Sequence, residues 1–333
     1  MSVSEEAKKF LDSRDSMNEA LDIIMKNPLV IYHSNCADGF SAAWVFHNVQ
    51  ERAEVTFDFH AGVYNKAPPD VKNRIVYLVD FSYKREVVKQ MCEDAVEVIL
   101  IDHHKTAIGD LDPLTDERSA EFVPNFSRYV DIERSGAMLA WDYWHNTKFG
   151  DDGEVDTYYI PGDHDYHAPP LLLDHIQDRD LWKFKLSGTR EINANVFSHE
   201  YTFENWDQLM SSTGADLLKM TVAGAAIERK HHKDIKELLN VCTRYLDIGG
   251  FTVPVASLPY TLASDAAGQL ASEYKNGSLF AACYYDTAND RVFSLRSGQG
   301  GIDVALVAEQ YGGGGHKHAS GFKVPRSHPL AMS

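Results

Sequence analysis

The stretch "VEVILIDHH", residues 96–104, ends an apolar run in three side chains that bind protons and metal ions. Its centre, Val98–Ile101, has no polar residue, which is typical of a strand buried on both faces of a parallel sheet. Asp102, His103 and His104 follow directly. A loop has no packing requirement for this combination, so the stretch predicts a strand that delivers ligands to one edge of a sheet.

Short apolar runs alternate with helical patterns around this stretch. The alternation predicts an α/β domain with a mostly parallel sheet covered on both faces. The expected strands are 29–32, 55–60, 73–82 and 96–104, and the expected helices are 41–49, 84–95, 134–147 and 170–184. Asp38-Gly39 is expected to form a turn, and residues 147–170 an insertion or surface loop.

The character of the chain changes after residue 204. Residues 205–248 are predicted to be a helical connector, and residues 249–327 a smaller α/β domain. The larger domain is then residues 1–204, which begins with an acidic helical pattern. In the smaller domain the expected strands lie within 249–259, 278–298 and 318–325, with a hairpin turn at 287–290 and helices at 262–274 and 302–310.

The charge balance limits the class of partner. The 333 residues include 32 Lys and Arg against 49 Asp and Glu, a net charge of −17. This excess argues against a protein that coats long duplex nucleic acid. It permits a short substrate or a chain end, since a local cationic site can outweigh the global charge. The sequence leaves the oligomeric state open.

Location is predicted from the apolar runs and the cysteines. No apolar run is long enough to span a membrane, so no membrane partner is expected. The N-terminus lacks the basic start and apolar centre of a signal peptide. Four cysteines, at 36, 92, 242 and 283, show no CxxC spacing. They predict a reducing cytoplasm, with neither a disulfide framework nor a zinc finger.

Three of the expected strands end in ligand-type side chains. His33, with Asp38 just beyond, follows the first strand, Asp80 the third, and Asp102–His104 the fourth. A single Asp at a strand end is usually a cap or turn residue. The carboxyl ends of parallel strands, however, share one edge of the sheet, so these groups should meet there. Three coincident strand ends therefore favour a functional site.

Such a cluster would repel itself unless cations neutralised it. Mixed carboxylate and imidazole ligands suit Mn²⁺, with Mg²⁺ or another divalent ion as alternatives. A bridging carboxylate can hold two ions about 3.5–4 Å apart, an arrangement used in phosphoester hydrolysis. The sequence therefore predicts a site for two divalent ions.

The same residues carry a family resemblance. "HSNCADGF", "YLVDFS", "LIDHHKTA" and "IQDRDLWKF" resemble the four ordered motifs of the DHH phosphoesterase superfamily. "SLRSGQGGIDVALVAEQYGGGGHKHASGF" resembles the DHH-associated substrate-binding domain, so the likeness covers roughly residues 28–325. The superfamily includes RecJ-type exonucleases, nanoRNases, cyclic-dinucleotide and pAp phosphodiesterases, and exopolyphosphatases. "DHHKTA" and "RDLW" are nearest to the nanoRNase branch.

The resemblance implies a metal-binding role for four residues at the first three motifs. Asp38 would bind one metal ion, and Asp80 would bridge two. His33 would serve the first ion, and His103 would be the ligand from the signature.

Further roles are implied around the signature and the fourth motif. Asp102 would hold a histidine and fix its tautomer, and His104 would contact the scissile phosphate or orient the site. Asp180 would complete the shell of the second ion. Asp178 is a rival for that role, and at least one of the two is expected on a solvated helix face.

The second domain is expected to hold the substrate. Consecutive glycines let backbone N–H groups approach an anion closely, although such a run can also be a flexible linker. Arg296, beside Ser297, could clamp a phosphate with two parallel hydrogen bonds, and His316 would contact the phosphate or the base. The candidate glycines are Gly313, Gly314 and Gly315, within the run that starts at Gly312.

One position departs from the family. Many members carry an aspartate two residues before the one that matches Asp38, and this chain has Cys36 there. A thiolate is a soft ligand that favours zinc or iron over magnesium. Alternatively, Cys36 packs as a small apolar residue, and the sequence leaves both interpretations open.

Together, these observations predict a cytoplasmic hydrolase that cleaves phosphodiester bonds in short oligonucleotides and releases nucleoside monophosphates. The alternatives are a cyclic-dinucleotide, pAp or polyphosphate phosphohydrolase, or a catalytically weakened nucleotide-binding protein.

Overall fold

The computed structural model describes residues 27–64, 66–149, 155–158, 163–164, 166–273, 279–298 and 300–332. The expected N-terminal acidic helix lies outside these residues. The chain forms two compact units. The first takes in the described residues up to His103 together with Asp110–Thr189 and Val196–Leu218, and the second takes in His104–Gly109, Arg190–Asn195 and the chain from Lys219 onward. The three-part division predicted from the sequence stays a prediction.

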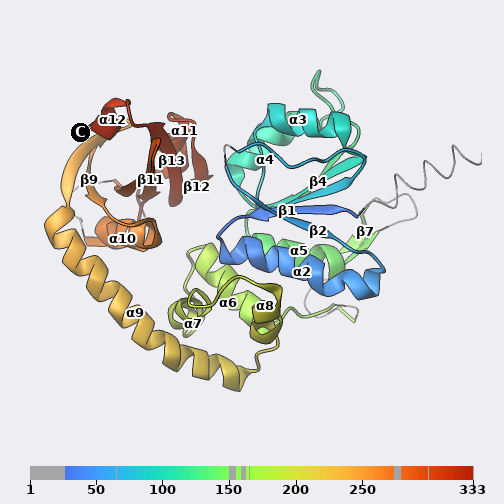
Figure 1. Ribbon diagram of the computed structural model, residues 1–333, viewed down its shortest axis with the longest axis horizontal. Helices are drawn as coiled ribbons and strands as arrows, with labels where there is room; N and C mark the ends of the chain where they lie inside the picture. Colours follow the sequence, from blue (N-terminus) through green and yellow to red (C-terminus); the bar gives the residue numbers. More distant parts are fainter. Residues whose placement is uncertain are drawn as a thin grey trace, which may run out of the picture. The chain divides into compact units, whose positions relative to one another are not determined.

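The first unit contains a five-stranded sheet in which every neighbouring pair is parallel (Figure 1). In spatial order the strands are β2 (Asp58–Gly62), β1 (Leu29–His33), β3 (Ile75–Val79), β4 (Glu97–Asp102) and β5 (Phe126–Val130). This arrangement confirms the predicted α/β class with a parallel sheet. The sequence analysis did not predict β5, which is less buried than β4 and lacks its continuous apolar run.

Helices cover both faces of this sheet (Figure 1). On one face, Leu29, Val76 and Leu100 of the strands share a buried apolar cluster with Val88 and other residues of α3. On the other face α2 packs against β1, and α5 packs against β3 and β4. The helices along the chain up to residue 210 are α2 (Ala37–Ala53), α3 (Arg85–Asp94), α4 (Lys105–Leu111), the 3₁₀ helix η1 (Asp112–Leu114), α5 (Gly136–His145), α6 (Leu171–Asp180), α7 (Thr189–Val196) and α8 (Phe203–Met210). Most of α4 and of α7 belongs to the second unit.

Two local predictions were wrong. Asp38-Gly39 is not a turn, because α2 already begins at Ala37. The chain turns earlier, where Asn35 has a φ of 55°. The 147–170 segment is not only a loop, since β6 (Thr147–Phe149) and β7 (Val155–Tyr158) pair as a small antiparallel sheet.

The second unit contains a six-stranded sheet of mixed direction. Its order is β12 (Gly314–His316), β13 (Ala319–Pro325), β11 (Asp290–Arg296), β10 (Ala281–Asp286), β9 (Phe251–Ser257) and β8 (Arg244–Ile248). The β10–β11 hairpin is the predicted one, and the N–H of Thr287 donates to the carbonyl of Asp290 across its turn. Only the pair of β9 and β10 is parallel among the described strands of this sheet.

Each face of the second sheet has its own apolar core. Phe293, Phe322 and Val255 pack with α11 and α12 on one face. Ala281 and Cys283 pack with Leu239 of α9 and Leu270 of α10 on the other. The helices are α9 (Gly214–Cys242), α10 (Tyr260–Glu273), α11 (Val304–Glu309) and α12 (Pro329–Met332). None of the helices in the described residues combines the length and apolarity that crossing a bilayer requires.

The contact between α9 and α7 depends on a missing side chain. A Cβ atom added to Gly224 would lie 1.7 Å from the carbonyl oxygen of Glu191. Gly224→Ala is therefore expected to lower the free energy of unfolding by about 1–3 kcal/mol, although alanine favours a helix. Denaturant titration measures this change.

Gly214→Ala, in the same helix, is the matched control, because an added Cβ there meets nothing within 4 Å. It should leave stability unchanged or raise it by up to about 1 kcal/mol. Equal effects of the two substitutions would contradict the packing argument.

Candidate metal centre

The strand order β2-β1-β3-β4-β5 has a switch point between β1 and β3. The helix that follows β1 packs on one face of the sheet, and the helix that follows β3 contributes to the core on the other. In open α/β sheets the ligand site lies beyond the carboxyl ends of the strands at such a point. His33 ends β1 and Asp80 directly follows β3, so both sit there.

Asp80 faces two histidines with its two carboxylate oxygens. Its Oδ1 lies 3.1 Å from Nε2 of His103, and its Oδ2 lies 3.6 Å from Nδ1 of His33. The backbone of Asp80 has a φ of 52°, which is unfavourable for a residue with a side chain. Its N–H is held by the carbonyl of Ile101 on β4, at 3.0 Å. Strain of this kind persists where the surrounding structure fixes it, often at functional sites.

The carboxylate of Asp38 is fixed by the N-terminus of α5. Its two oxygens accept hydrogen bonds from the N–H groups of Gly136, at 2.6 Å, and Ala137, at 3.2 Å. Burial raises the pKa of Asp38 well above its ordinary value, and the charges of Asp80 and Asp180 raise it further. His103 acts in the opposite direction. The N-terminus of α5 thus orients the carboxylate of Asp38 at a place where a negative charge on that carboxylate is unfavourable.

The two aspartates at the end of α6 have different positions. Oδ2 of Asp180 lies 3.5 Å from Nε2 of His103. Asp178 instead accepts hydrogen bonds from the N–H groups of Lys185 and Leu186 and from the hydroxyl of Thr189.

These bonds make Asp178 part of the turn that follows α6. Burial would raise its pKa, but the three hydrogen bonds lower it below the ordinary value. Asp178 is 6% exposed, so the expectation of a solvated position does not hold for it.

His103 is fully buried among the carboxylates. Burial by itself lowers its pKa, but the hydrogen bond with Asp80 and the charges of Asp180, Asp80 and Asp38 outweigh burial and raise the pKa to about 10. Without a metal ion the carboxylates therefore favour the imidazolium form of His103, in which both ring nitrogens are protonated. Asp102, also buried, accepts a hydrogen bond from the backbone N–H of His103 at 2.7 Å, which fixes the signature at the end of β4.

Two groups of donor atoms in this cluster share no residue, and Asp80 belongs to the second of them. Asp38, His103 and Asp180 make one group, and His33, Cys36 and Asp80 make the other. Within each group the donor atoms lie within 4.8 Å of one another. Carboxylate oxygens with imidazole nitrogens form a donor set for divalent ions such as Mn²⁺. Because the charges of Asp80 and Asp180 raise the pKa of Asp38, the residues present fit a cationic occupant.

Cys36 lies at the N-terminus of α2 with extended backbone angles, and its side chain caps no helix N–H. Burial raises the pKa of its thiol, and Asp80, Asp180 and Asp38 raise it further.

The ring of Tyr64 packs edge-on against His33, with centroids 5.2 Å apart. Tyr64 is 46% exposed and was not predicted as part of the site, because no pattern marks it.

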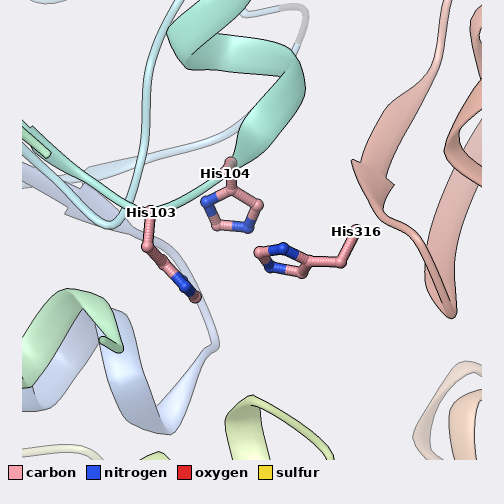
Figure 2. Close-up of side chains that lie close together, drawn as sticks. All are labelled: His103, His104 and His316. Atoms are coloured by element: carbon pink, nitrogen blue, oxygen red, sulfur yellow. The ribbon is translucent and has the colours of Figure 1, made fainter. Parts of the chain in front are cut away.

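Two histidines from different motifs meet in the second unit. Figure 2 shows the rings of His104 and His316 side by side, with centroids 4.7 Å apart. The N–H of Gly315 donates to the hydroxyl of Thr106 at 3.3 Å. From the sequence, His104 was expected to contact the scissile phosphate or orient the site, and His316 to contact the phosphate or the base. The two rings lie together in the structure.

Arg296 and Ser297 are engaged inside the second unit. The guanidinium of Arg296 donates to the carbonyl of Leu295 at 2.8 Å and to the hydroxyl of Ser264 in α10. The hydroxyl of Ser297 donates to the carbonyl of Ile302 and lies 2.9 Å from Nδ1 of His318. A clamp on phosphate would require Arg296 to turn from Ser264.

The glycine run is a helix end followed by a strand, and it is not a linker. The N–H of Gly312 donates to the carbonyl of Glu309, and that of Gly313 to the carbonyl of Ala308, which closes α11. Gly314 and Gly315 then pair with β13. A Cβ atom on Gly313 would lie 2.1 Å from the carbonyl oxygen of Gly321, so the run is needed for close backbone contact.

The sequence analysis missed the contribution of the α5 N-terminus. A Cβ atom on Gly136 would lie 2.4 Å from Cβ of Asp80, and its N–H already holds Asp38. Ser135 is the N-cap, and its hydroxyl accepts a bond from the N–H of Met138. The pattern Ser-Gly before an apolar helix marks a helix start, but nothing in it indicates the partner 98 residues earlier.

Comparisons with known proteins agree with this fold. No family model matches the chain. An uncharacterised protein of Acanthamoeba polyphaga mimivirus is 25% identical over 311 residues, and the match covers 88% of this chain and 66% of that protein. The chain thus spans slightly less than two thirds of the length of this relative.

Among solved structures, a DHH-domain protein described as a member of a family of ribosomal proteins matches with a TM-score of 0.52. Identity is 14%, and the match covers 97% of this chain and 89% of that one. RecJ from Thermus thermophilus in complex with Mn²⁺ matches at a TM-score of 0.44 and 14% identity, over 93% of this chain and 51% of that one. The match to the DHH-domain protein shows that the chain has the DHH-domain fold, which agrees with the α/β fold expected from the ordered motifs.

Proposed function

We propose that this chain is a divalent-metal-dependent phosphoesterase that hydrolyses phosphodiester bonds in short oligonucleotides and releases nucleoside monophosphates. The observation that carries the proposal is the pair of donor groups at the sheet switch point, with Asp80 in contact with both His33 and His103. Because its two oxygens face a histidine of each group, Asp80 could bridge two adjacent cations.

In this mechanism His33, Asp38, Asp80, His103 and Asp180 would hold two ions, with Mn²⁺ the expected metal and Mg²⁺ an alternative. Two such ions, when bound, supply positive charge to the phosphate and lower the pKa of an attacking water.

The chain's own groups keep these ligands in place. The N–H groups of Gly136 and Ala137 donate to the two oxygens of Asp38 and orient its carboxylate. Asp102 accepts a hydrogen bond from the backbone N–H of His103. When an ion binds, the ring of His103 would release the proton from the nitrogen that binds the ion.

The net charge of the chain and the polar side chains of its second unit favour a short substrate. A net charge of −17 disfavours long nucleic acid, while His104, His316 and Arg296 could contact the phosphates of a short one. The motif likeness to the nanoRNase branch favours oligonucleotides. Cyclic dinucleotides, pAp and polyphosphate share the same phosphate chemistry and remain the alternatives.

Product analysis tests this assignment. Labelled RNA and DNA of two to five nucleotides are incubated with the protein and Mn²⁺, beside a cyclic dinucleotide, pAp and polyphosphate. The short oligonucleotides should turn over fastest and release nucleoside monophosphates. Fastest turnover of any of the other three compounds would refute the assignment.

The metal centre itself is tested by Asp80→Asn. The substitution removes the negative charge of the carboxylate that would bridge the two ions. The Mn²⁺-dependent rate should therefore fall by roughly 100- to 1,000-fold. Asp94→Asn, at an exposed position in α3, is the control and should keep full activity. If Asp80→Asn retains most of the rate, the two-ion proposal is wrong.

Gly136 is expected to position two ligands at once. Gly136→Ala would push on Asp80 and disturb the N–H that holds Asp38. Calorimetry should then show Mn²⁺ affinity lower by about 10- to 100-fold, the range found when groups that orient ligands are changed. Gly109→Ala is the control, because an added Cβ meets nothing within 4 Å there. Unchanged affinity in Gly136→Ala would show that the site tolerates the displacement.

Substrate contacts in the second unit predict a different kinetic signature. Arg296→Ala and His316→Ala should mainly raise KM and leave kcat less affected, because these groups would bind the substrate and would not hold the metal ions. Arg326→Ala and His328→Ala, in the same unit, serve as controls. An unchanged KM for both Arg296→Ala and His316→Ala on a short oligonucleotide would remove the assignment.

A further inference from the structure

Cys36 occupies a different environment from the cysteines that pack in the cores. Cys92 belongs to the apolar cluster beneath α3, and Cys283 to the cluster beneath α10. Cys36 belongs to neither, is partly exposed and lies in the electrostatic field of Asp38, Asp80 and Asp180. A thiol that served only as a small apolar side chain would gain little from such surroundings.

The chain places Cys36 by means of a sharp bend. β1 ends at His33, Asn35 takes a left-handed φ of 55°, and α2 begins right after Cys36. The bend brings the thiol back beside the end of its own strand. As a result, a donor atom of His33, the sulfur of Cys36 and an oxygen of Asp80 lie within 4.8 Å of one another.

We propose that His33, Cys36 and Asp80 form a nitrogen–sulfur–oxygen site that selects a thiophilic divalent ion, such as Zn²⁺, over Mn²⁺. The inference rests on the metal centre of the proposed function and concerns which ion one of its two positions takes. Asp38, His103 and Asp180, the other group, contain no sulfur and suit a harder ion. The two positions of this centre would therefore differ in metal preference.

The geometry of the group is compatible with such an ion. Zinc binds sulfur at about 2.3 Å and imidazole nitrogen at about 2.0 Å, which places two tetrahedral ligands roughly 3.5 Å apart. In the structure the corresponding donor atoms of His33, Cys36 and Asp80 lie within 4.8 Å of one another, so they would need to move only modestly closer together to bind such an ion. When the metal–sulfur bond forms, the thiol proton is released to solvent. The side chain of His33 is 28% exposed, so solvent reaches this group, and the fourth ligand could be water or a phosphate oxygen, as in catalytic zinc sites.

Co²⁺ provides a direct test, because a thiolate bound to Co²⁺ gives a ligand-to-metal charge-transfer band in the near ultraviolet. Metal-free full-length protein is titrated with Co²⁺, and bound metal is counted independently by calorimetry. The band should appear in the unaltered protein and be lost in Cys36→Ser and Cys36→Asp. Cys242→Ser, a partly buried cysteine in α9, is the matched control and should retain the band.

A second measurement compares Zn²⁺ and Mn²⁺ affinities. Cys36→Asp replaces sulfur with oxygen, so it should shift the preference toward Mn²⁺ by about tenfold or more. Circular dichroism verifies that each variant is folded. Loss of the band together with this shift supports the inference.

Two outcomes of the Co²⁺ titration contradict the proposed sulfur ligand. Co²⁺ binding without a charge-transfer band in the unaltered protein, or a band that survives in Cys36→Ser, would overturn the inference. Mn²⁺-dependent hydrolysis measured on the same samples reports separately on the proposed function, which stands if the rate is intact while the band is absent. Absence of both metal binding and hydrolysis would refute the metal centre and the inference together.

Discussion

Mutual repulsion among buried carboxylates is the constraint on which the rest of this structure depends. Asp38, Asp80 and Asp180 surround His103, and burial together with the other two charges raises the pKa of Asp38. An unsupported group of this kind would separate or take up protons. The fold instead holds each carboxylate by a different element, so the group stays together and offers a place for cations.

The supports are backbone groups that side-chain patterns do not reveal. Asp80 keeps a left-handed φ because its N–H is bonded to β4 and because Gly136 leaves room beside its Cβ. A left-handed backbone at a non-glycine residue costs about 1 kcal/mol or more. Asp178 organises the turn that follows α6, so it acts on Asp180 only through the chain. The strain and the hydrogen bonds thus serve one purpose, which is to hold charges that repel.

The difference between side-chain patterns and backbone contacts explains which parts of the site could be predicted from the sequence. Residues at the ends of apolar strands could be assigned because a parallel sheet brings its carboxyl ends to one edge, and Asp80 and His103 followed from that rule. The contact of Asp38 with α5 could not, because it joins residues 98 positions apart through backbone N–H groups. The different contacts of Asp178 and Asp180 could not be predicted either, since both residues lie at one helix end. The packing of the glycine run could not be predicted either, because its close contact is with Gly321 of the neighbouring strand.

The order of the strands determines whether a centre forms at all. β1, β3 and β4 are consecutive in the sheet, so His33, Asp80 and His103 come from three neighbouring strand ends. Because neighbouring strands lie about 4.8 Å apart, one carboxylate on the middle strand can reach a histidine on each side. Asp80 does this with its two oxygens. If β3 lay at an edge, the same residues would have the same spacing in sequence and yet form no bridged pair of donor groups. The bridging position of Asp80 is therefore a property of the topology, and the identity of the residues around it, Cys36 included, decides which ions the topology can hold.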